Sequence, residues 1–144
     1  MTHPCDSVEG LKGLLRAEGL RATSPRLAVM ELLRDARAPL SHAALTERLP
    51  AGNFDRATVY RILSDLTGVG ILRRMDLGDH IWRFEFSDPC RGLTQEHAHF
   101  LCNTCDEVSC LPESVMAGLK AAGRWAASFQ QAQIRIRGVC PDCM

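Results

Sequence analysis

Cys102-Asn-Thr-Cys105 and Cys140-Pro-Asp-Cys143 decide the fold of the C-terminal half of this 144-residue chain. Each segment is a CxxC pair, whose two sulfurs can both reach one ion at about 2.3 Å. Four thiolates close a tetrahedral zinc site and leave no open position, which indicates a structural rather than a catalytic ion. The 34 residues between the pairs, 106 to 139, exceed common zinc-finger spacings, so a folded unit must bring the pairs together.

The composition favours a metal protein over a disulfide scaffold. Seven cysteines would suit a secreted disulfide framework, but the N-terminus lacks a charged-then-apolar signal pattern. No apolar run approaches the roughly 18 residues of a membrane span. We therefore expect a cytoplasmic chain in a reducing compartment, with no membrane partner. Its length allows one compact unit or two small domains.

Short helices are predicted over the first 70 residues. Ser24 is expected to cap one helix, with Pro25 at its first helical position, and Ser41 and Asp55 to cap two more. The helix after Asp55 repeats apolar residues at helical spacing, which predicts a buried face. The residues of that face are Val59, Ile62, Leu63 and Leu66.

The sequence period changes from helical spacing to two after residue 70. Ile71–Asp76 and His80–Glu85, joined by a turn at Leu77–Asp79, predict a β-hairpin. Helices followed by a hairpin are the order of a winged helix-turn-helix module. Residues 113–127 then predict a helix, and 131–137 alternate as a strand.

These patterns predict an α+β fold of two domains. An N-terminal winged helix-turn-helix DNA-binding domain is expected at 1–84, and a hinge or loop at 85–95. A small α/β dimerisation domain with a four-cysteine zinc site is expected at 96–144. This second half is too small to stand alone comfortably, which favours dimerisation and zinc as its supports.

Asp55-Arg-Ala-Thr-Val-Tyr-Arg61 is the candidate DNA-reading segment. It places polar and basic residues off the apolar stripe near a helix N-terminus, where a recognition helix meets base edges. An ordinary amphipathic helix with solvated arginines is the alternative, and the following hairpin disfavours it. The predicted DNA contacts are Arg56, Thr58, Tyr60 and Arg61, with Lys12, Arg16 and Arg21 near the first helix and Arg73 and Arg74 on the wing.

Net charge neither supports nor excludes nucleic-acid binding. The formal charge is zero, and up to residue 80 the chain has 11 basic and 10 acidic residues. Any DNA-binding surface must therefore come from the local placement of arginines.

Together these segments resemble the ferric uptake regulator family of bacterial metal-sensing repressors. The resemblance covers nearly the whole chain and follows the family's order of motifs: Gly19–Arg26, Ala57–Arg61, Arg83–Glu85, His97-Ala-His99 and the four cysteines. It implies a homodimer that binds a palindromic operator in double-stranded DNA when a sensory metal is bound. It implies release of DNA when metal is scarce, with no small-molecule substrate.

The resemblance also implies a regulatory metal site between the two domains. Glu85, His97 and His99 match three family ligands, and Cys110 falls where the family usually has a carboxylate. The family also has a histidine ligand before the recognition helix, and this sequence does not match it. Pro39 occupies that position, and His42 lies three residues further on. His80 is the preferred substitute, while His42 and Cys90 stay open. Ala98 and Ala117 stand where carboxylates of an auxiliary site would be expected, which predicts one sensory site.

Two imidazoles, a carboxylate and a thiolate favour zinc over iron or manganese, because sulfur is a soft ligand. We therefore expect a structural zinc ion and a second, regulatory divalent ion, with zinc favoured over ferrous or manganous ion. An iron-responsive regulator, or a peroxide sensor that oxidises Cys110 or Cys90, could use the same scaffold. A metal-dependent hydrolase and a zinc-ribbon interaction module are further alternatives. A hydrolase is disfavoured because no separate general base is found, and an interaction module leaves the Arg56–Arg61 helix unexplained.

Overall fold

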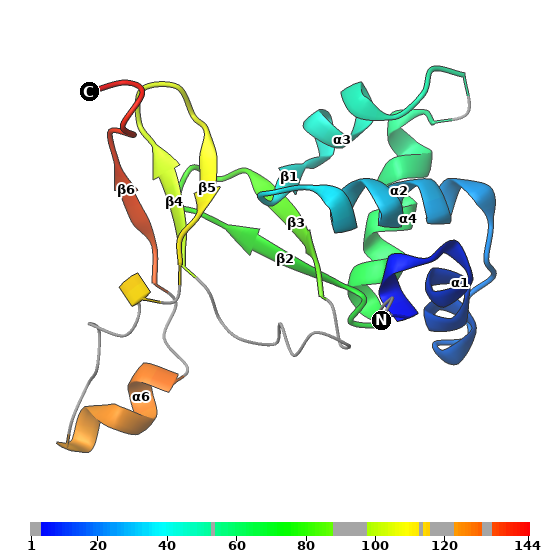
Figure 1. Cartoon of the computed structure of the whole chain (residues 1–144), viewed down its shortest axis with the longest axis horizontal. Helices are drawn as coiled ribbons and strands as arrows, with labels where there is room; N and C mark the ends of the chain where they lie inside the picture. The colour runs from blue at the N-terminus through cyan, green and yellow to red at the C-terminus, as the bar shows by residue number, and fades with distance from the viewer. Residues whose placement is uncertain (1–3, 53, 88–97, 113, 116–122, 131–133) are drawn as a thin grey trace. The chain divides into compact units, whose positions relative to one another are not determined.

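The computed structural model describes residues 4–52, 54–87, 98–112, 114–115, 123–130 and 134–144. The chain forms two compact units, Met1–Asp76 with His80–Gln95, and Leu77–Asp79 with Glu96–Met144. The first holds helices α1 to α4 and one three-stranded sheet, and the second holds another three-stranded sheet (Figure 1). Helices and sheets therefore combine in the α+β fold that was predicted. No helix within the described residues is both long enough and apolar enough to cross a membrane.

The helices of the first unit begin at side-chain caps. The predicted caps Ser41 and Asp55 are confirmed, since they accept the N–H groups of Ala44 at 3.1 Å and Thr58 at 2.7 Å. The prediction of Ser24 is wrong by one residue, because the cap is Thr23 and Ser24 is already helical. The helical elements are η1 (Pro4–Asp6), α1 (Val8–Ala17), α2 (Ser24–Asp35), α3 (His42–Arg48) and α4 (Arg56–Gly68).

One apolar core unites these helices with the sheet of the first unit. Leu11 and Leu15 from α1, Met30 from α2 and Leu45 from α3 are fully buried. The predicted apolar face of α4 packs into the same core, and all four of its residues are buried. The exposed side of α4 is thereby fixed, because a helix that buries one face presents the opposite face to solvent.

The wing is an antiparallel hairpin of β2 (Leu72–Asp76) and β3 (Trp82–Phe86). A third strand, β1 (Leu40–Ser41), pairs with the other edge of β3. Phe84 and Phe86 point into the core, whereas Arg83 and Glu85 alternate to the other face. The predicted hairpin is confirmed, but its connection is longer than predicted and runs from 77 to 81.

The second unit is a sheet in the order β5-β4-β6 (Figure 1). Strand β4 (His99–Cys102) pairs antiparallel with β5 (Val108–Cys110) and parallel with β6 (Ile136–Gly138). Gly138 packs beneath the Phe100 ring, and a Cβ at this position would lie 3.3 Å from a ring carbon. A side chain there would force the ring to shift, so glycine keeps β4 and β6 in contact.

The helix predicted over 113–127 lies partly outside the described residues. Within them, a 3-10 turn, η2 (Gly123–Trp125), precedes α6 (Ala126–Gln130). Gly123 has φ 66°, which an α-helix does not admit, so the predicted single helix does not continue through this position.

Truncating the core face of α4 should destabilise the protein. Leu66 is fully buried, so Leu66→Ala should lower the free energy of unfolding by about 2–5 kcal/mol through lost burial and a cavity. Ser64, on the exposed face of the same helix, is the matched control, and Ser64→Ala should change it by less than about 0.5 kcal/mol. Urea unfolding followed by circular dichroism measures both. Equal effects of the two variants would contradict the assigned face.

Candidate functional site

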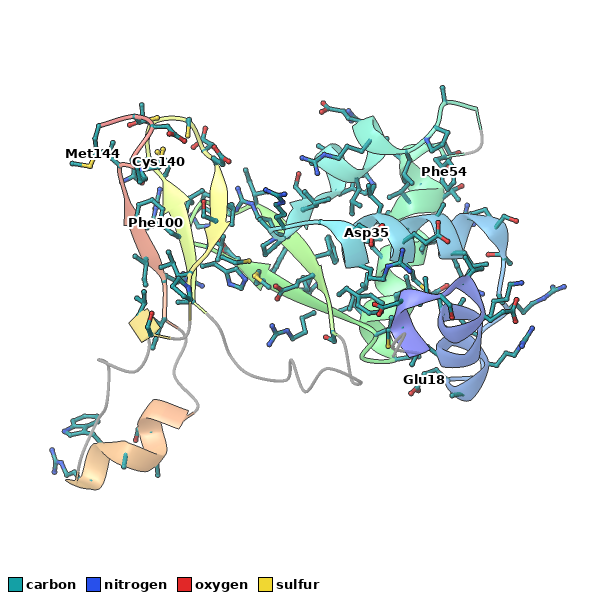
Figure 2. All side chains as sticks on the ribbon, viewed as in Figure 1. Glu18, Asp35, Phe54, Phe100, Cys140 and Met144 are labelled. Carbon is teal, nitrogen blue, oxygen red and sulfur yellow. The ribbon has the colours of Figure 1, made fainter. Side chains whose placement is uncertain are left out.

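The four cysteines of the two CxxC pairs converge in the second unit. The sulfurs of Cys102, Cys105, Cys140 and Cys143 all lie within 4.8 Å of one another, and those of Cys105 and Cys140 are 3.9 Å apart. A tetrahedron with metal–sulfur bonds of 2.3 Å has sulfur–sulfur edges of about 3.8 Å. The donor set and its spacing therefore fit a zinc ion. In Figure 2, Cys140 is labelled near one end of this sheet, and Phe100 is labelled further along the same sheet.

Local backbone geometry shapes the knuckle around Cys102. Asp106 adopts φ 59°, and its N–H donates to the carbonyl of Cys102 at 3.1 Å, which closes the first turn. The second pair is closed when the N–H of Cys143 donates to the carbonyl of Cys140 at 3.0 Å. Asp106 thus adopts the left-handed conformation that the turn needs.

Backbone N–H groups lower the pKa of the Cys102 thiol. The N–H groups of Cys105 and Cys140 point to its sulfur and lower the pKa of Cys102 to about 6, and the Cys140 contact measures 3.3 Å. Neighbouring sulfurs have the opposite effect on Cys143, where hydrogen bonds with Cys140 and Cys105 raise the pKa to about 12. In the metal-free protein the first thiolate therefore forms easily and the last with difficulty, and a divalent cation relieves this repulsion.

A second pair of metal-binding side chains lies on β4 and β5. His99 and Cys110 are directly opposite partners in the antiparallel ladder, with a ring nitrogen and the sulfur within 4.8 Å. His99 is 8% exposed, while Cys110 is exposed. The Cys110 side chain is therefore not packed in a core. These two residues come together as the resemblance implied.

The other predicted regulatory ligands are distributed over different parts of the chain. Glu85 lies on β3 in the first unit, where Arg73 donates to its Oε2 at 2.8 Å. His80 was predicted on the wing strand, but it lies in the connection before β3, with φ 61° and its N–H donating to Asp76 Oδ1 at 3.2 Å. His97 and Cys90 lie outside the described residues.

His42 has a partner other than a metal. Its Nε2 donates to the backbone carbonyl of Arg56 at 2.9 Å, and its ring meets the Tyr60 ring edge-on at 6.3 Å. His42 thus ties α3 to the start of α4, which sequence reasoning missed, because the contact depends on how two helices pack. A carbonyl only accepts hydrogen bonds, so Nε2 carries the proton and the lone pair of the neutral ring lies on Nδ1.

The N-terminal part of α4 presents the side chains predicted to read DNA. Arg56, Tyr60 and Arg61 are exposed, Tyr60 by 63%, and Thr58 is half-buried. The exposure of the tyrosine ring is unusual for so large a side chain and leaves it free to contact a partner. Helix α4 follows α3 as the second helix of a helix-turn-helix, which is the recognition helix in that motif.

The remaining cations predicted to face DNA differ in their surroundings. Arg16 and Arg21 are exposed, whereas Lys12 is paired with Glu9 at 2.8 Å. On the wing, the Arg74 guanidinium stacks over the exposed Trp82 ring, 4.2 Å from its centre. Arg73 is engaged with Glu85, so Arg74 is the better placed of the two wing arginines to meet a phosphate.

Comparison with known proteins gives one consistent family. The model of the family described as "Ferric uptake regulator family" matches residues 17–136. Ferric uptake regulation protein 1 of Mycolicibacterium fortuitum is 31% identical over 98 residues, 67% of this chain and 58% of that protein. The ferric uptake regulation protein of Synechococcus elongatus is 28% identical over 139 residues, 92% of each chain. The crystal structure of the Vibrio cholerae ferric uptake regulator, 25% identical, covers 90% of this chain and 99% of that one with a TM-score of 0.70.

A winged helix-turn-helix unit, followed by a unit whose four cysteines fit a metal ion, is typical of metal-responsive transcriptional regulators. The chain belongs to the ferric uptake regulator family of metal-responsive transcriptional regulators. The family predicted from the motifs is thereby confirmed. The relatives named above are regulators, so the chain is placed with regulators and not with enzymes.

Removing one thiolate of the cluster should release a tightly held zinc ion. We expect Cys140→Ser to lose one zinc per chain, while Cys110→Ser, outside the cluster, keeps it. Acid should release the same ion from the unaltered protein, because protons compete for thiolates as the pH falls. Metal analysis after dialysis against a weak chelator at stepped pH measures both effects. Full zinc content in Cys140→Ser would contradict the assigned cluster.

Proposed function

We propose that this protein is a zinc-responsive DNA-binding repressor that binds a palindromic operator as a homodimer when its regulatory site is loaded. The observation that carries the proposal is the direct pairing of His99 with Cys110 beside, but separate from, the four-thiolate cluster. A closed four-thiolate site serves structure, since it offers no exchangeable position. An exposed thiol beside an imidazole offers a second place for an ion.

The donor set supports zinc as the sensed ion. Glu85, His97, His99 and Cys110 would supply one carboxylate, two imidazoles and one thiolate, with His80 as a further candidate. Zinc accepts such mixed nitrogen, oxygen and sulfur sets, whereas ligand sets without sulfur suit the harder ferrous and manganous ions. His42 stays open as a ligand, because the hydrogen bond from its Nε2 to the Arg56 carbonyl leaves Nδ1 able to bind an ion.

The regulatory mechanism we propose is a population shift between arrangements of the two units. Glu85 belongs to the first unit, and His99 and Cys110 belong to the second. An ion shared by all three would favour one arrangement of the DNA-binding unit over the others, by the difference in ion affinity between arrangements. In a two-fold symmetric dimer, that arrangement would set the two α4 helices at the spacing of successive major grooves.

Operator binding should depend on zinc through His99 and Cys110. With the structural zinc in place, added zinc should raise operator affinity more than ferrous or manganous ion. His99→Ala or Cys110→Ser should reduce zinc-dependent operator affinity at least roughly tenfold, because each change removes a ligand. Fluorescence anisotropy with labelled operator DNA measures this, and sedimentation checks that the variants remain dimeric. A response to ferrous or manganous ion but not to zinc would refute zinc sensing.

Contacts from α4 should control DNA affinity without affecting metal content. Arg61→Ala should weaken operator binding by about 1–3 kcal/mol and reduce its salt dependence, because it removes an exposed cation from the recognition helix. Arg124, an exposed arginine of the second unit, is the control, and Arg124→Ala should leave operator affinity unchanged. Zinc content should stay the same in both. Equal operator affinities of Arg61→Ala and the unaltered protein would remove α4 from the interface.

Exposed Cys110 beside His99 also favours one second candidate, a thiol-based peroxide sensor. A thiolate next to a metal or a histidine is easily oxidised to a sulfenic acid by peroxide. Peroxide-dependent release from DNA that is lost in Cys110→Ser, with zinc retained, would favour this candidate over the zinc sensor.

A further inference from the structure

Arg73 and Glu85 form an ion pair inside the wing hairpin. They are directly opposite partners of β2 and β3, and Arg73 Nη2 donates to Glu85 Oε2 at 2.8 Å. Their side chains are 34% and 15% exposed. Water therefore screens this contact less than it screens an ion pair at the open surface.

The guanidinium contacts the carboxylate through one of its nitrogens only. The hydrogen bond to Glu85 runs from one terminal nitrogen, Nη2, rather than from the two-nitrogen fork that arginine can offer. The Arg73 Nε is buried and has no hydrogen-bond partner among the described residues. A buried donor without a partner destabilises the arrangement that creates it. Arg73 thus offsets the charge of Glu85 through one terminal nitrogen.

We infer that Arg73 takes the place of the sensory cation at Glu85 in the metal-free protein and so lowers the affinity of the regulatory site for its metal. The inference rests on the proposed function, because it takes Glu85 as a ligand of the regulatory ion. The β2–β3 register keeps the Arg73 backbone opposite Glu85. A divalent ion bound by that carboxylate therefore meets a guanidinium of like charge and must displace it or share the carboxylate with it.

The opposite role for Arg73 makes an opposite prediction. Carboxylates that bind metals are often held in place by a hydrogen bond from a neighbouring residue, and loss of that residue weakens metal binding. If Arg73 merely orients Glu85, its removal lowers metal affinity. If Arg73 competes with the ion, its removal raises metal affinity.

Two variants separate the charge of Arg73 from its shape. Arg73→Met keeps an apolar stem without the charge, and Arg73→Lys keeps the charge without the fork. With the structural zinc in place, zinc competition against a chromophoric chelator should show about tenfold tighter binding at the second site in Arg73→Met. The zinc affinity of the second site in Arg73→Lys should stay close to that of the unaltered protein. Unchanged or weaker binding in Arg73→Met overturns the inference.

Thermal unfolding gives a second readout that does not depend on a chelator. With zinc in the four-cysteine cluster and no second ion, Arg73→Met should unfold at a lower temperature than the unaltered protein, since it loses the ion pair with Glu85. Added zinc should raise its midpoint more than that of the unaltered protein, because tighter binding stabilises the folded state more. A smaller zinc-induced rise would overturn the inference as well.

Glu85→Gln tells apart a failure of this inference and a failure of the proposed function. If Glu85→Gln binds zinc at the second site as tightly as the unaltered protein, Glu85 is not a ligand and the proposed ligand set falls. If Glu85→Gln weakens zinc binding but Arg73→Met does not tighten it, Glu85 is a ligand and Arg73 does not compete with the ion. If Glu85→Gln weakens zinc binding at the second site and Arg73→Met tightens it, both the proposed ligand set and the role of Arg73 are supported.

Discussion

Convergence of four thiolates is the constraint on which the second unit depends. Cys102 ends β4, and Cys140 lies two residues after β6 ends at Gly138, so one ion would join the ends of two parallel strands. Parallel pairing across a long connection carries a loop-closure cost that a metal clamp offsets. Once β4 is fixed, β5 folds back antiparallel on it, and the register then sets His99 opposite Cys110.

The four-cysteine cluster and the proposed regulatory site involve opposite ends of strand β4. The C-terminal end of β4 leads into the four-sulfur cluster, whereas its first residue, His99, faces the exposed Cys110. A saturated site suits a permanent ion, and a site with mixed, accessible donors suits an exchangeable one. On the first unit, Glu85 is paired with Arg73, so the proposed sensor combines the imidazole of His99 and the thiol of Cys110 with a carboxylate that already has a cationic partner.

Local patterns in the sequence predicted those features that depend on local interactions. The CxxC spacing, the caps Ser41 and Asp55 and the apolar face of α4 are each set within a few residues. Features that depend on longer-range geometry were missed. A turn over Leu77–Asp79 would pair Arg73 with Arg83, but the connection to residue 81, with His80 at φ 61°, shifts the register by two and pairs Arg73 with Glu85. The contact from His42 to Arg56 likewise arises only from the packing of α3 on α4.

An optical titration with cobalt(II) tests most directly whether Cys110 and His99 hold the exchangeable ion. Cobalt replaces zinc in tetrahedral sites, and bound thiolate gives it an intense near-ultraviolet charge-transfer band. With zinc retained in the cluster, we predict that added cobalt produces this band in the unaltered protein. The band should be absent in Cys110→Ser. In His99→Ala, the visible spectrum of the bound cobalt should change. A cobalt site without thiolate character, or one unaffected by either change, would contradict the proposed sensor.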